Sequence, residues 1–193
     1  SSSADIGGVL TVESGTLTSS NIYGPIYLTN AAGTFRMTGG TVNGTGTRGA
    51  VHVNAAGTVE ITGGRVESDF VGVRLSDRAK SASITIGSVP ESDEQNKEEA
   101  EKVYISSIAP YGADVILHSG IVGEVKLGTF GANSTYGCWF EKPVSDSFLP
   151  AEKTNTSFTS NNKTYYKLIN LTEADTAAKI ITADGSVQRY ASL

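Results

Sequence analysis

Cysteine and histidine are scarce in this sequence, and their scarcity excludes several kinds of site. Among 193 residues there is one cysteine, Cys138, and there are two histidines, His52 and His118. A single cysteine excludes an intrachain disulfide and a cysteine-based zinc cluster. Two histidines leave little for a histidine-based metal site or a catalytic triad. We therefore expect no metal and no cofactor.

Charged residues are also few, at 18% of the chain, where about a quarter is usual. Fifteen Lys and Arg against twenty Asp and Glu leave a net charge of −5. A nucleic-acid binder normally carries a basic stripe, and acidic membrane surfaces attract basic segments, so we expect neither as a partner. No apolar run approaches the roughly 20 residues of a membrane span, and we expect no membrane insertion.

What the sequence has instead is glycine, threonine, serine and valine in a repeated pattern. Its 22 glycines and many β-branched residues favour turns and strands over helices. Two consecutive 24-residue units, 33–56 and 57–80, share the pattern GT-x-x-x-TGG-x-V. Residues 8–32 form an earlier copy, and two degenerate copies follow within 83–105 and 115–127.

Stacking the five copies aligns their apolar residues in five columns. All twenty-five positions are apolar, and the residue between two column positions is usually polar, which is typical of strands with one buried face. The columns, from the first to the fifth, are Leu10, Phe35, Val59, Ile84, Val115; Val12, Met37, Ile61, Ile86, Leu117; Leu17, Val42, Val66, Val89, Val122; Ile26, Val51, Val73, Val103, Val125; and Leu28, Val53, Leu75, Ile105, Leu127.

A unit of about 24 residues with three short strands is one rung of a solenoid, because a single unit cannot bury its own apolar face. Stacking rungs at roughly 4.8 Å turns the columns into one continuous core. The pairs Gly39-Gly40 and Gly63-Gly64 would allow the positive φ that a corner between two sheets requires. The sequence therefore predicts an all-β fold, a single-stranded parallel β-helix of about five rungs, over residues 1–130.

Two segments depart from the repeat. Residues 90–102 interrupt the fourth copy with an acidic stretch. We interpret it as a surface helix or loop; the alternative is a calcium site, although the D-x-D-x-D-G spacing of a calcium loop is missing. Residues 131–193 lack the template and contain two predicted hairpins, in 156–171 about an Asn-Asn turn and in 178–193 about an Asp-Gly turn. We expect this region to be a β-rich C-terminal cap or the start of a following module.

The residues between the core columns point outward and form two outer ladders. The first ladder is Thr11, Arg36, Glu60, Thr85 and Ile116, and the second is Tyr27, His52, Arg74, Tyr104 and Lys126. A β-helix enzyme that cleaves polysaccharides needs converging carboxylates. The first ladder holds one carboxylate, Glu60, which we expect to form a surface ion pair with Arg36. The second ladder holds none, so we predict no catalytic residues.

The candidate ligand-binding residues are Tyr27, His52, Arg74 and Tyr104 of the second ladder. Planar groups stacked at roughly 4.8 Å would form a flat platform. Such a platform could stack on sugar rings and hydrogen-bond to their hydroxyls. The alternative interpretation is that the ladder only stabilises its sheet through cross-strand contacts.

The stretch GTFRMTGGTVNGTGTRGAVHVNAAGTVEITGG, residues 33–64, resembles the glycine- and threonine-rich repeats of large bacterial cell-surface proteins. Those repeats form right-handed parallel β-helices of the pectin-lyase-like kind, and most members are adhesin-like, spacer or uncharacterised proteins. The resemblance implies a right-handed helix in a secreted protein of the bacterial cell surface. It also implies further modules of the same chain beside this one, and as partner we expect a glycan or a host surface ligand.

We therefore expect a non-catalytic extracellular module of a large bacterial surface protein, an adhesive or glycan-contacting stalk. One alternative is a polysaccharide-acting β-helix enzyme, a lyase or glycosidase, or a fragment of one, because the same fold hosts such enzymes. A second alternative is a pure structural spacer. An enzyme should show a cleft with two carboxylates within roughly 5–10 Å of one another, whereas a binding module should expose the ladder from Tyr27 to Tyr104.

Overall fold

The structure, a computed structural model, describes residues 4–5, 7–88, 102–126, 136–141, 152–160, 163–169, 178–181 and 187–190. Over these ranges the fold is all-β, and parallel strands form a solenoid of about four turns. The predicted fold class is therefore confirmed. The predicted count of about five rungs is slightly high, because the last copy contributes only two short strands and an isolated bridge at Val125.

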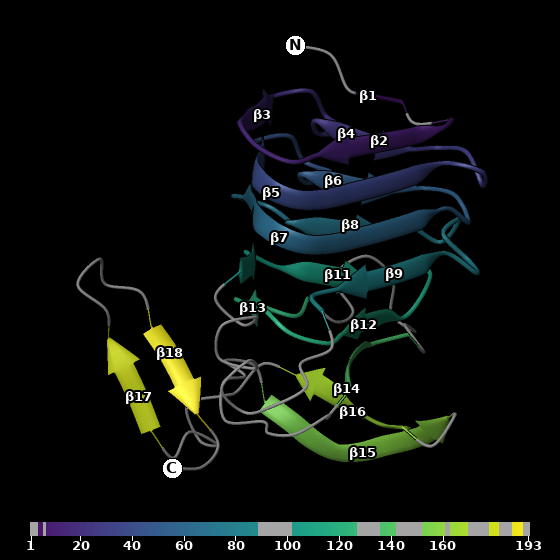
Figure 1. The fold of residues 1–193 in the computed structure, drawn as a ribbon. Coiled ribbons are helices and arrows are strands. Elements are labelled where there is room, and N and C mark those ends of the chain that lie inside the picture. Colours follow the sequence, from purple (N-terminus) through teal and green to yellow (C-terminus); the bar gives the residue numbers. More distant parts are fainter. Residues whose placement is uncertain are drawn as a thin grey trace.

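One large sheet of eleven strands forms two faces of the solenoid (Figure 1). Its strands are β2 (Val9–Val12), β3 (Thr16–Ser19), β5 (Thr34–Gly44), β7 (Thr58–Ser68), β9 (Ser83–Ile86), β10 (Val103–Ile105), β12 (Val115–Leu117), β13 (Ile121–Val122), β14 (Cys138–Glu141), β15 (Glu152–Ser160) and β16 (Lys163–Ile169). The first halves of β5 and β7 pair with β2 and β9, and their second halves pair with β3 and β10. These two long strands therefore bend from one face to the next.

A second sheet of five parallel strands forms the third face. In order, its strands are β1 (Ala4–Asp5), β4 (Ile26–Leu28), β6 (Val51–Val53), β8 (Val73–Leu75) and β11 (Ile108–Pro110). Each of these strands belongs to a different turn of the chain and pairs with the strand of the next turn. A separate antiparallel pair consists of β17 (Ala178–Ile181) and β18 (Val187–Tyr190).

The first two predicted columns are confirmed in every turn. Met37 pairs with Ile61, Ile61 with Ile86, and Ile86 with Leu117. The four side chains are completely buried. The same register continues beyond the predicted repeats, because Leu117 pairs in parallel with Phe140 of β14. Identical apolar positions therefore lie over one another from turn to turn, as the 24-residue period requires.

The sequence prediction assigns the later strand of the fourth copy to the wrong face of the solenoid. We predicted Val103 and Ile105 in the fourth and fifth columns, but Ile105 pairs with Val66 and lies in the third. The fourth and fifth positions belong to Ile108 and Pro110 of β11. Two apolar triplets, VYI and IAP, stand only two residues apart, and an alternation pattern cannot tell which of them continues which column. Val89 and Leu127, the remaining members of these predicted columns, fall outside the described residues.

The corners between the first two faces depend on glycine. Gly40 in β5 and Gly64 in β7 have φ of +79° and +90°, which confirms the predicted positive φ. A side chain at Gly64 would also collide with the backbone of the preceding turn, because a Cβ there would lie 2.5 Å from the Gly40 carbonyl oxygen. Adjacent turns approach too closely at this corner for any residue larger than glycine.

Antiparallel pairing ends the parallel stack. Strand β14 pairs in parallel with β12 on one side and antiparallel with β16 on the other, and β16 pairs antiparallel with β15. Both predicted C-terminal hairpins have the expected antiparallel strands, while their turns lie outside the described residues. The acidic insertion, apart from Lys102, and the predicted boundary at residue 130 also lie outside them.

Candidate functional site: the outer faces of the solenoid

Three members of the second outer ladder lie in register on the five-stranded sheet. Tyr27 of β4 pairs with His52 of β6, and His52 pairs with Arg74 of β8. Each residue is the middle of an apolar triplet whose flanking residues are buried in the core. Strand alternation therefore directs all three side chains to the outer side of the same sheet.

Tyr104 does not belong to this ladder, so the predicted four-residue platform is wrong at its last position. The strand that follows β8 presents Ala109 opposite Arg74. Tyr104 lies on β10, between Arg65 of β7 and Ile121 of β13. Its ring lies 4.3 Å from the Arg65 guanidinium carbon, in a cation–π contact on another face. The misplacement has the same cause as that of Ile105, namely two neighbouring apolar triplets.

Two residues that the sequence reasoning missed complete the stack. The Tyr23 ring lies 4.5 Å from the Tyr27 ring at 19°, and the Tyr27 ring lies 5.0 Å from the His52 ring at 23°. The Arg48 guanidinium carbon lies 4.9 Å from the centre of the Tyr23 ring. We call Tyr23, Tyr27, Arg48, His52 and Arg74 together the planar column. A signal was available, since Tyr23 and Arg48 each stand four residues before a ladder position in consecutive repeats.

His52 is buried rather than exposed. Its side chain has no accessible surface, and neither ring nitrogen has a hydrogen-bond partner. Burial, followed by the nearby charges of Arg74 and Arg48, lowers the pKa of His52 from 6.5 to about 3. The ring is therefore neutral at physiological pH and packs as a flat, uncharged group against its neighbours.

The rings of the planar column pack against one another. The Tyr23, Tyr27 and His52 rings contact one another pairwise, because the Tyr23 and His52 centroids also lie only 6.4 Å apart, and Arg48 covers Tyr23. The Tyr27 hydroxyl accepts a hydrogen bond of 3.2 Å from Asn54 Nδ2. Tyr23, Tyr27 and Arg48 are each half-buried, so only part of each side chain remains for an external partner. This arrangement favours cross-strand stabilisation over stacking on a sugar ring.

Ion pairs with arginine hold two carboxylates on the outer faces. Arg36 Nε and Glu60 Oε2 lie 2.6 Å apart between adjacent turns, with both side chains about half exposed, which confirms the predicted surface ion pair. Arg65 and Glu67 form a second pair at 2.7 Å, and both residues lie within β7. In the part of the chain that the structure describes, no three His, Cys, Asp or Glu side chains are grouped to hold a metal ion.

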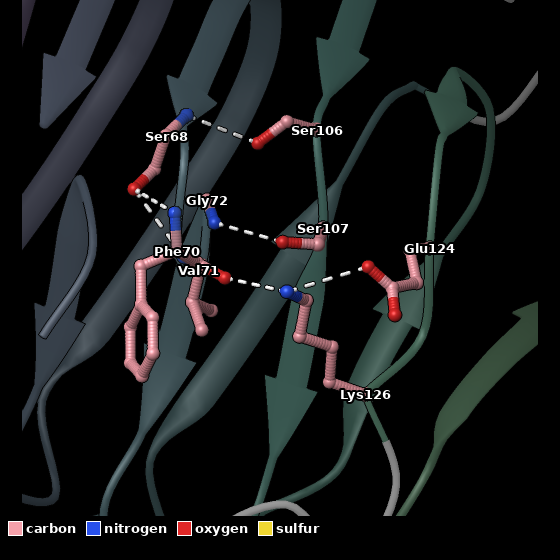
Figure 2. A network of polar contacts seen from close by, with 8 residues as sticks. All are labelled: Ser68, Phe70, Val71, Gly72, Ser106, Ser107, Glu124 and Lys126. Atoms are coloured by element: carbon pink, nitrogen blue, oxygen red, sulfur yellow. Dashed lines mark hydrogen bonds and ion pairs between the residues drawn. The ribbon is translucent and has the colours of Figure 1, made fainter. Parts of the chain in front are cut away.

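Figure 2 shows a polar network that ties the later turns together. The Gly72 N–H donates to Ser107 Oγ at 3.2 Å. Lys126 Nζ donates to the Phe70 carbonyl at 2.6 Å and lies 3.3 Å from the Glu124 carboxylate. Lys126, which we predicted as the last member of the second ladder, therefore cross-links two turns of the solenoid.

Comparison of the chain with known protein families, curated proteins and solved structures found no match. Among the helices of the described residues, none has the length and apolarity to cross a membrane.

Proposed function

We propose that this chain is a non-catalytic extracellular stalk module of a bacterial surface protein. The observation that carries the proposal is the unbroken register of the core columns, from Leu10 through Val115 to Cys138 in the first column. A stack of this kind is quasi-one-dimensional, and its length is fixed by the number of turns. The bacterial cell-surface origin is supported by the likeness of residues 33–64 to the repeats of such proteins.

A stalk must keep its length under load, and optical tweezers can measure this property. Handles can be attached through Gly8→Cys and Ser160→Cys, because an added side chain at Gly8 meets nothing within 4 Å and Ser160 is exposed. We expect a constant length followed by an abrupt rupture. A smooth extension that begins at the lowest forces would contradict the stalk function, because it would indicate a flexible linker.

A second candidate function, glycan contact through the planar column, is favoured by the partial exposure of Tyr23, Tyr27 and Arg48. A glycan array with wild type, Tyr27→Ala and Arg48→Gln tests this candidate. Tyr104→Ala is the matched control, because Tyr104 lies on another face. Binding that both column variants lose and the control retains would support contact through the column. Equal binding by all four proteins would exclude it.

A further inference from the structure

The outer side of β9 and β12 carries a hollow of about 490 Å³ that neither outer ladder predicted. Its walls come from the turn before β9, from the starts of β9 and β12, and from the residue two before β14. The volume lies within the roughly 300–1,000 Å³ of small-molecule sites. The lining residues are Ser81, Ala82, Ser83, Ile84, Thr85, Ala113, Asp114, Ile116 and Tyr136.

The chemistry of the lining differs from that of the turns above it. Arg36 and Glu60 form an ion pair on the same face, whereas the next positions of that ladder are Thr85 and Ile116. The hollow thus combines three hydroxyl side chains, several apolar side chains, one tyrosine and one carboxylate. This mixture suits a ligand with both hydroxyl groups and an apolar face.

The carboxylate of Asp114 is held in a fixed orientation. Its Oδ1 accepts hydrogen bonds of 2.8 Å from the Gly137 N–H and of 2.8 Å from the indole N–H of Trp139. Asp114 is nevertheless exposed, so its second oxygen can receive hydrogen bonds from a ligand. A carboxylate held in this way is a strong acceptor for sugar hydroxyls and repels anions.

The backbone at the rim of the hollow is strained. Ser81 has φ of +67° and is the one non-glycine residue with a positive φ in the described part of the chain. The turn that holds it is closed by a 2.8 Å hydrogen bond from the Ala82 N–H to the Ala79 carbonyl. Glycine would fit this conformation without strain, yet a hydroxyl-bearing residue lines the hollow at this point.

We propose that this hollow binds a neutral pyranose sugar, with Asp114 as the main hydroxyl acceptor and Ser81, Ser83 and Thr85 as further partners. The site is independent of the stalk function and of the planar column, since it lies on β9 and β12 of the large sheet.

Saturation-transfer NMR with the full chain tests the proposal, using methyl glycosides of glucose, galactose and mannose as neutral probes and glucuronate as the anionic probe. We expect transfer to at least one neutral glycoside and weaker transfer to glucuronate. Asp114→Asn keeps an acceptor for Gly137 and Trp139 but removes the charge, and should weaken binding about tenfold or more. Arg36→Gln, on the same face outside the hollow, is the control and should bind as the wild type does.

Ser81→Gly separates binding from stability. Relief of the positive φ should raise the melting temperature while loss of the hydroxyl weakens sugar binding. The proposal is overturned if no neutral glycoside binds, if glucuronate binds as well as they do, or if Asp114→Asn, folded as judged by circular dichroism, binds as tightly as the wild type.

Discussion

At the scale of single residues, burial determines chemistry in this molecule. His52 lies on the outer side of its strand, yet the rings and arginines around it remove it from water. Cys138 continues the first core column beneath Val115. In both cases, burial changes the behaviour of a group that would otherwise be reactive or titratable.

The buried His52 should make the fold sensitive to acid. Its pKa of about 3 in the fold lies below the ordinary 6.5 of the unfolded chain. The unfolded chain therefore binds more protons between these values, so the contribution of His52 is complete above pH 6.5 and is lost as the pH falls. The free energy of unfolding should decrease by about 1.4 kcal/mol per pH unit in this range.

Urea unfolding of wild type and His52→Phe from pH 7 to pH 4 measures this dependence. Phenylalanine keeps a flat ring in the column but cannot take up a proton. The difference in stability between the two proteins should shift in favour of the variant as the pH falls. A difference that stays constant with pH would show that His52 does not contribute to the acid sensitivity.

Cys138 should be inert in the folded protein. Burial, aided by the nearby charge of Asp114, raises the pKa of the Cys138 thiol to about 12. The thiolate required for attack is therefore almost absent at neutral pH. Ellman's reagent should not react with the native protein and should react fully in denaturant. An added exposed thiol, Ser160→Cys, is the positive control, and rapid labelling of native Cys138 would contradict the prediction.

At the scale of elements, the corner glycines determine how closely two turns can approach. Gly64 combines a positive φ with a close approach to Gly40 and Met37 of the preceding turn. Gly15 has a similar φ of +78°, but an added Cβ there would meet nothing within 4 Å. An alanine at Gly15 would therefore suffer backbone strain alone, whereas an alanine at Gly64 would suffer both strain and a steric clash.

Gly64→Ala should destabilise the protein more than Gly15→Ala does. Strain alone costs about 1–3 kcal/mol at either position, and the collision adds to this cost at Gly64 only. Thermal or urea unfolding of both variants provides the comparison. Equal losses of stability would mean that the corner can relax and that the close approach is not a constraint.

Elements also show how far sequence reasoning extends. The pairing of Met37 with Ile61 was predictable because both stand in the same place of two nearly identical repeats. The position of Tyr104 was not, because two apolar triplets compete for one column where the repeat is degenerate. The hollow beside Asp114 was also missed, since it depends on Tyr136 and on the return of β14, which the 24-residue template does not include.

At the scale of the whole molecule, each turn is stabilised by the turns on both sides of it. Ile61 is completely buried between Met37 and Ile86. Leu10 lies in the terminal strand β2 and is only partly buried. Stability in such a stack is approximately a sum over turns and the interfaces between them.

Truncation in the middle of the stack should therefore cost more than truncation at its end. Ile61→Ala should lower the free energy of unfolding by about 2–5 kcal/mol, and Leu10→Ala should lower it by less. Urea unfolding of both variants measures the two losses. Similar losses would indicate that the first turn is packed as tightly as the central ones.

Because successive turns share one register, duplication of a repeat would lengthen the solenoid by one turn. A further copy of residues 33–56 inserted after Ala56 would face the same neighbours above and below as the original copy. Each insertion would add roughly 4.8 Å to the span. A repeat could not be added in the same way after β14, because the antiparallel strand β16 already pairs with that edge. The solenoid can therefore lengthen by duplication of an internal repeat, while the pairing of β14 with β16 stays unchanged.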